Sequence, residues 1–183
     1  MKRAIIVLAA LSAACAPTTT TETKTVATTT AISDPALTAR FSKVLWPTIM
    51  DYRYYGQGDP QSPPGSNSDM AKFKAVLAPG ATVDIKHRAQ GIGEVVGPDG
   101  VELGETNNVN LANTSITELK GSDATVLACY TYDFTARSEY PHTNDHAVPG
   151  ASEVTFTLRK TTDWLVSDIA NNHTVPDCQP SKA

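Results

Sequence analysis

Residues 153–170, EVTFTLRKTTDWLVSDIA, decide the fold of this chain. Apolar side chains stand at every second position, Val154, Phe156 and Leu158, and polar side chains stand between them. This period of two is typical of a strand with one face in a core and one face in water. The Thr-Thr-Asp that follows predicts a tight turn, and the apolar run that begins at Trp164 predicts a second strand. The stretch therefore predicts an antiparallel hairpin that ends a sheet.

The segments before this hairpin divide into a helical part and a strand part. Apolar residues from Leu37 to Ile49 recur at helical spacing after the start signal Ser33-Asp34-Pro35, with Pro47 as a point where the helix kinks or restarts. A second helix is expected over 68–77. From Ala81 onward the period changes to two, which predicts strands over 81–88, 94–103, 109–119 and 125–134. In the first of these, Val83, Ile85 and His87 share one face. The second is a hairpin around Gly97–Gly100, and the third is broken near Asn113. Helices followed by antiparallel strands predict an α+β fold, in which N-terminal helices pack on one face of a curved sheet.

The N-terminus carries an export signal. Lys2-Arg3 precede a short apolar run over 4–11, and small residues lead to Cys15. This is the pattern of a secretory signal peptide over 1–14, and the run is far below the ~20 residues that span a bilayer as a helix. The segment resembles the bacterial lipoprotein signal, with Ser12 where that family usually has Leu. The resemblance implies a diacylglyceryl group on Cys15; the alternative is an ordinary secreted protein cut nearby, with Cys15 incidental.

Residues 15–32 have the composition of a tether. They hold two threonine runs and almost no large apolar side chain, so they cannot bury enough surface to offset the entropy of ordering them. We expect a flexible, lipid-anchored spacer over 15–32 and one folded domain over 33–183. The formal net charge is −4 and no basic stripe is present, which argues against nucleic-acid binding and against attraction to anionic lipid headgroups. Membrane attachment would therefore depend on the lipid.

The three cysteines make an odd number. If Cys15 carries a lipid, Cys129 and Cys178 remain as a pair in an oxidising compartment, and we expect a disulfide between them, with two buried free thiols as the alternative. His142 and His146 have a spacing that suits a metal, but they stand in a polar stretch without cysteine or carboxylate partners at standard offsets. We expect neither a metal nor a cofactor.

The order of elements over about residues 34–178 resembles the NTF2-like superfamily, also called SnoaL-like or cystatin-like α+β. The hairpin of 153–170 is similar to that family's last two strands, where a Trp commonly follows the turn, as Trp164 does here. The resemblance implies helices lying across a strongly bent sheet to form a cone. More narrowly, the layout is similar to small actinobacterial envelope lipoproteins of unknown function, which pair a cysteine in a central strand with one near the C-terminus.

Enzymes of that superfamily place a carboxylate inside the cone, often with a Tyr or a His, and an apolar wall would raise the pKa of such a carboxylate. Each candidate also has a structural interpretation, such as a solvated helix end, a satisfied histidine or a strand end, and other enzyme signatures such as G-x-S-x-G and H-E-x-x-H are absent from the sequence. We therefore nominate no catalytic set. The residues that could line a pocket are Asp51, Tyr52, Tyr55, His87, Tyr130 and Asp168.

Three functions follow from these observations. The first is an exported, lipid-anchored envelope protein whose non-catalytic NTF2-like domain binds a small apolar ligand or an envelope protein. The second is a phage- or prophage-type surface interaction protein. The third is an isomerase- or dehydratase-like enzyme of the same fold, which requires two titratable groups that converge in a cavity. An open cavity would favour binding of a ligand, whereas a cavity filled by side chains would favour binding of a protein partner.

Overall fold

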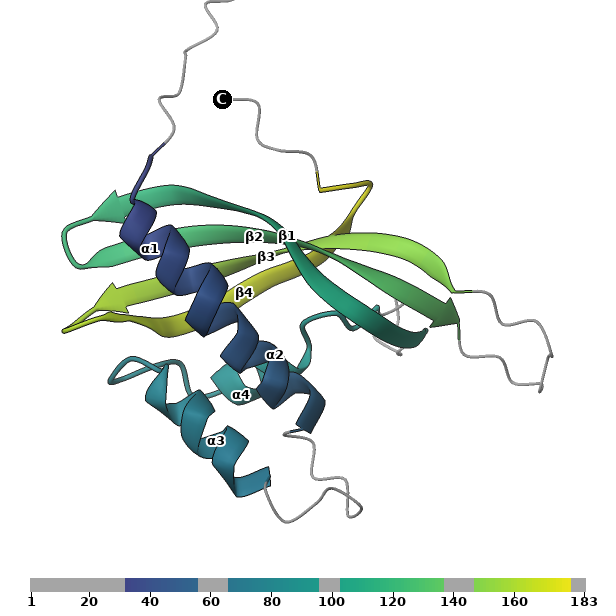
Figure 1. Cartoon of the computed structure of the whole chain (residues 1–183), viewed down its shortest axis with the longest axis horizontal. Helices are drawn as coiled ribbons and strands as arrows, with labels where there is room; N and C mark the ends of the chain where they lie inside the picture. The colour runs from purple at the N-terminus through teal and green to yellow at the C-terminus, as the bar shows by residue number, and fades with distance from the viewer. Residues whose placement is uncertain (1–31, 56–65, 96–102, 137–146, 179–183) are drawn as a thin grey trace, which may run out of the picture.

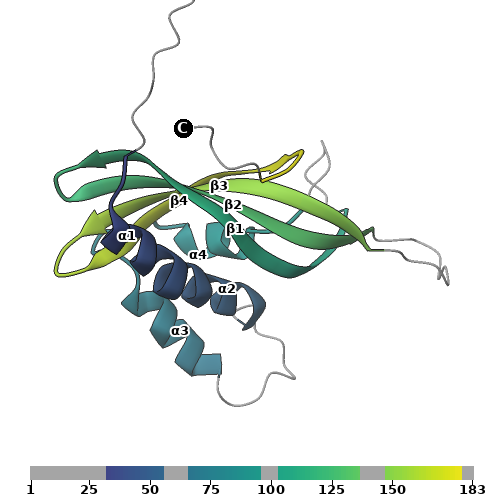
Figure 2. The same ribbon diagram turned by 45° about the horizontal axis from the view of Figure 1, so that its top comes forward.

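A computed structural model describes residues 32–55, 66–95, 103–136 and 147–178. Its sheet has the order β1-β2-β3-β4, and every neighbouring pair is antiparallel. The helices lie on one side of this sheet in both views (Figures 1 and 2). The predicted α+β class is therefore confirmed. The elements are α1 (Pro35–Arg40), the π-helical segment η1 (Phe41–Leu45), α2 (Trp46–Tyr55), α3 (Ser66–Ala75), α4 (Ile85–Gln90), β1 (Gly104–Lys120), β2 (Asp123–Ala136), β3 (Val148–Lys160) and β4 (Trp164–Val175).

The first helix begins where the sequence predicts. Asp34 is its N-cap, and the carboxylate accepts a hydrogen bond of 2.9 Å from the Leu37 N–H, while Pro35 opens the first turn. The helix does not break before Pro47. It widens through η1, where the Trp46 N–H bonds to the Phe41 carbonyl, five residues back. A proline cannot donate to the carbonyl four residues before it and its ring crowds that carbonyl, so a wider turn lets the helix pass Pro47.

The predicted final hairpin is confirmed as β3 and β4, with Lys160 opposite Trp164 across the turn. The interruption predicted near Asn113 is also present, because the register of β1 against β2 shifts between Leu111 and Asn113. The disulfide Cys129–Cys178 joins β2 to the C-terminal segment across 49 residues of sequence, as predicted. No helix in the four described ranges is long and apolar enough to cross a membrane.

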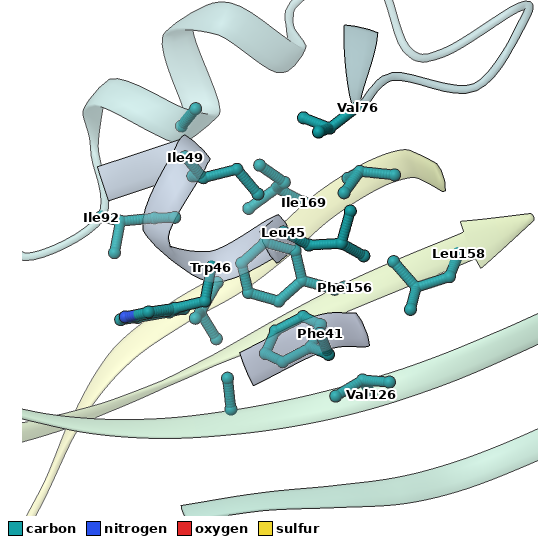
Figure 3. Packing of buried hydrophobic residues seen from close by; sticks show 14 of the residues in the cluster. Phe41, Leu45, Trp46, Ile49, Val76, Ile92, Val126, Phe156, Leu158 and Ile169 are labelled. Atoms are coloured by element: carbon teal, nitrogen blue, oxygen red, sulfur yellow. The ribbon is translucent and has the colours of Figure 1, made fainter. Parts of the chain in front are cut away.

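One hydrophobic core lies between the helices and the inner face of the sheet. Phe41 and Trp46 project from η1 and α2 and meet Phe156 of β3, with ring centroids 5.0 and 6.2 Å away (Figure 3). Trp46 also contacts Tyr130 of β2, at 5.5 Å. These four rings are at most 5% exposed, so aromatic side chains occupy the space that they share between helix and sheet.

The strand predicted over 81–88 is wrong, because this segment holds the helix α4. Ile85 and Ala89, one helical turn apart, are both buried, and Val83 is fully exposed. The Arg88 Nε lies 2.8 Å from a carboxylate oxygen of Asp84, an ion pair at the i,i+4 spacing that supports a helix. The turn predicted at 97–100 lies outside the described residues; beside it, the Leu103 N–H bonds to the Val95 carbonyl at 2.9 Å.

The edge strand β4 contains two irregularities that change which side chains face the core. Leu158 pairs with Val166 but Thr157 pairs with Asp168, so one extra residue, Ser167, is accommodated between them. A second shift separates the pair Thr155–Ala170 from Glu153–His173. Asn171 in that second shift has a φ of 55°, in the left-handed region. The pattern of alternation that the sequence shows at the start of β4 is thus not maintained to its end.

Candidate functional site

Two of the six candidate pocket residues, Tyr52 and Tyr130, belong to the core instead of lining an open cavity. Tyr52 of α2 stacks on Phe73 of α3 with 4.0 Å between ring centroids. Tyr130 is fully buried among aromatic side chains of α2 and β2. Burial raises the pKa of both phenols above the ordinary value, so each side chain stays neutral over the physiological range.

The Tyr130 hydroxyl joins three elements. It accepts a hydrogen bond of 2.9 Å from the Gly93 N–H and donates one of 2.6 Å to the Asn172 side-chain oxygen. The Asn172 amide nitrogen in turn donates to the Gly91 carbonyl at 2.8 Å. This chain of bonds fixes the end of β4 to the segment that follows α4, and it occupies both hydrogen-bonding roles of the phenol.

Asp168 lies in a second polar cluster, with Arg88 and Thr82. The Arg88 Nη1 is 3.0 Å from one carboxylate oxygen of Asp168 and also donates to the Ile169 carbonyl at 3.0 Å. The Thr82 hydroxyl donates to Asp168 at 2.8 Å. The extra residue Ser167 turns Asp168 away from the core face of Trp164 and Val166 on which the sequence placed it. Asp168 therefore attaches α4 to β4.

The remaining candidates do not converge on these groups. Asp51 is exposed on α2, and Tyr55 ends that helix with a side chain outside the described atoms. His87 is exposed on α4, not on the inner face of a strand. Within the described residues, the candidate carboxylates and the candidate tyrosines are therefore not brought to one cavity.

A pocket opens at the surface between α4 and β4, with a volume of about 390 Å³. We call it the α4–β4 pocket. Its α4 side is formed by His87, Arg88 and Gly91, and its β4 side by residues 169–172. Of the predicted candidates, His87 lines it directly, while Asp168 and Tyr130 bind the residues of its wall. Its volume falls within the usual range for small-molecule sites.

Several polar groups of this pocket have no partner among the residues that the structure describes. Arg88 uses Nε for Asp84 and Nη1 for Asp168 and Ile169, and the bonds leave its Nη2 unused. The imidazole of His87 and the carboxamide of Asn171 make no hydrogen bond in these ranges, although both residues line the pocket. The hydrogen bond from Arg88 also holds the pKa of the Asp84 carboxyl below its usual value.

Sequence reasoning did not find Arg88, Asn171 or Asn172. The sequence does indicate a role for Arg88 if this segment is helical, since Arg88 stands four residues after Asp84, the spacing of an ion pair along a helix. The two adjacent asparagines give only a weak indication of an irregular backbone, because Asn tolerates the left-handed conformation. Comparison with protein-family models and with curated protein sequences finds no match to this chain.

Proposed function

We propose that the chain is an exported envelope protein, anchored by a lipid on Cys15, whose NTF2-like domain binds a ligand at the α4–β4 pocket without transforming it. The cone expected of that superfamily would correspond here to the sheet and the helices α1 to α3. One observation carries the non-catalytic part of the proposal. Among the side chains suited to proton transfer, Tyr130 and Asp168 are each held in bonds that link structural elements, and Asp51 and His87 are exposed.

The filled core supports the same conclusion. An enzyme that works inside a cone needs room for a substrate next to a titratable group. In this domain Phe41, Trp46 and Phe156 contact one another where that room would be (Figure 3). Tyr130 adds a fourth ring by its contact with Trp46. The α4–β4 pocket instead lies at the surface and is lined by the exposed His87 and by Asn171, whose carboxamide makes no hydrogen bond within the described residues. Binding at this surface needs no rearrangement of the core.

The anchor is tested by intact-mass measurement of the protein from membrane and soluble fractions of a bacterial host that processes lipoproteins. We expect a diacylglyceryl mass increment on a chain that begins at Cys15, recovered from the membrane fraction. The variant Cys15→Ala should lose both the increment and the membrane association. An unmodified, soluble wild-type product that begins at another residue would show that the anchor is wrong.

A further inference from the structure

We propose that the α4–β4 pocket is a binding site for a neutral saccharide. The inference rests on the proposed function only in that the pocket is a ligand site, and it concerns the chemistry of that ligand. The pocket combines hydrogen-bond donors that protein groups leave unused with an arginine whose charge is already bound by two carboxylates. These two properties together select the class of ligand.

The free groups of the pocket are mainly donors. Arg88 Nη2 carries two N–H groups, and the Asn171 carboxamide adds two more with one carbonyl oxygen. A neutral His87 offers one donor and one acceptor. A ligand that satisfies these groups must be rich in oxygen acceptors and must also donate at a few positions. Hydroxyl groups do both, whereas an ammonium group only donates and would leave the arginine and amide N–H groups without partners.

The charges around the pocket argue against an anion. The single guanidinium of Arg88 is bound by two carboxylates, from Asp84 and Asp168, at 2.8 and 3.0 Å. A ligand carboxylate placed on Nη2 would approach a cluster in which two carboxylates face one guanidinium, an excess of one negative charge. A neutral hydroxyl or amide oxygen can accept from Nη2 without that repulsion.

The pocket also presents apolar surface and a fixed backbone. Gly91 and Ala170 have no polar side-chain atoms, so the C–H edge of a sugar ring can rest on them. Asn171, one of the residues that line the pocket, is held at a φ of 55°. A non-glycine residue held in a sparsely populated conformation is characteristic of functional positions, and here the strained residue is one with a free side chain.

Three sugars with the same ring separate the possible ligand classes: N-acetylglucosamine is neutral, glucuronate is anionic and glucosamine is cationic. We would titrate each sugar into the ¹⁵N-labelled mature chain carrying Cys15→Ala and follow the amide chemical shifts. The neutral series would also include the disaccharide of N-acetylglucosamine and the methyl glycosides of glucose, galactose and mannose. We expect saturable shifts at residues 87–91 and 169–172 with a neutral sugar at about millimolar Kd. Glucuronate and glucosamine should bind at least about tenfold more weakly, a difference of about 1.4 kcal/mol.

The variants provide a matched pair. Asn171→Gly removes the carboxamide and places glycine where φ is positive, so the fold is retained, and it should weaken sugar binding about tenfold or more. Asn108→Gly makes the same change at a second asparagine with positive φ among the described residues, at 53° in β1 and outside the pocket, and should leave binding unchanged. His87→Ala, on an exposed helix position, should weaken binding as Asn171→Gly does.

Three results would overturn the inference: no neutral sugar perturbs the pocket, a charged sugar binds as well as or better than the neutral ones, or Asn171→Gly binds like the wild type. These results are independent of the anchor. The titrated chain carries Cys15→Ala, and the anchor is measured separately by intact mass on the wild-type chain. No sugar binding together with a diacylglyceryl increment on wild-type Cys15 would reject the saccharide and retain the anchor, whereas sugar binding together with an unmodified wild-type chain would do the reverse.

Discussion

Removal of the Tyr130 hydroxyl tests the polar chain that attaches α4 to β4. Tyr130→Phe keeps the buried ring and its contacts with Trp46, so it opens no cavity. It deletes one acceptor for the Gly93 N–H and one donor to Asn172. Gly93 is buried, so its N–H is left without a partner and without ready access to water, whereas the side chain of the exposed Asn172 can turn to solvent.

The cost of this substitution follows from that difference. A buried donor left unsatisfied costs about 1–3 kcal/mol, while an exposed group that exchanges a protein partner for water costs little. We therefore expect Tyr130→Phe to lower the free energy of unfolding by about 1–3 kcal/mol. For a domain of this size the melting temperature should fall by about 2–4 °C for each kcal/mol.

Urea unfolding followed by tryptophan fluorescence measures this loss, because Trp46 contacts the Tyr130 ring. Tyr52→Phe is the matched control, since Tyr52 is also buried but its hydroxyl makes no hydrogen bond within the described ranges. The control should lie within about 0.5 kcal/mol of the wild type. Equal stabilities for Tyr130→Phe and the wild type would refute the reasoning, as would an equal loss in both variants.

Three further predictions follow from the same contacts. Burial raises the pKa of Tyr130 in the folded state, so the unfolded chain releases that proton at a lower pH. The free energy of unfolding should therefore fall as pH rises above about 10, and it should fall less steeply in Tyr130→Phe. Urea midpoints measured across this pH range test the difference. Gly150→Ala should cost about 1–3 kcal/mol by thermal melting, because a Cβ there would lie 2.7 Å from Cζ of the buried Tyr132; an unchanged melting temperature would contradict that packing. Reduction of the Cys129–Cys178 bond, which closes 49 residues of sequence, should lower the unfolding free energy by at most about 4 kcal/mol. The denaturant midpoint with and without a thiol reductant measures this loss, and an unchanged midpoint would contradict a net stabilisation by the bond.

The parts of the fold that the sequence predicted correctly depend on signals that are local or strongly periodic. The strand pattern over 153–159 alternates without interruption between polar and apolar residues, and Asp34-Pro35 combine a cap with a proline in the first turn. The disulfide followed from a cysteine count. In contrast, the pattern Val83-x-Ile85-x-His87 is too short to separate a strand from a helical turn. The structure selects the helix because Ile85 and Ala89 are both buried one turn apart.

The candidate site could not be predicted in the same way, because its geometry depends on the pairing between two strands. Asp168 stands two residues after Val166, and simple alternation therefore places both on the core face. The register of β4 against β3 inserts Ser167 as an extra residue, and Ile169 takes the inward position instead. Nothing in the sequence of β4 alone specifies that shift, since it is a property of the β3–β4 pair.

The irregular positions of β4 are also the positions that hold α4. The Ser167 carbonyl in the first shift accepts the Thr82 N–H at 3.0 Å, just before the helix, and Asn172 in the second shift donates to the Gly91 carbonyl just after it. Between them, Arg88 reaches the Ile169 carbonyl. A regular edge strand would alternate its side chains evenly, whereas here the two shifts let both Asp168 and Asn172 bond α4 or the residue that follows it. The two shifts in register and the pocket beside them are therefore one structural feature, and a substitution that restored regular pairing in β4 would remove the candidate site while leaving the central strands intact.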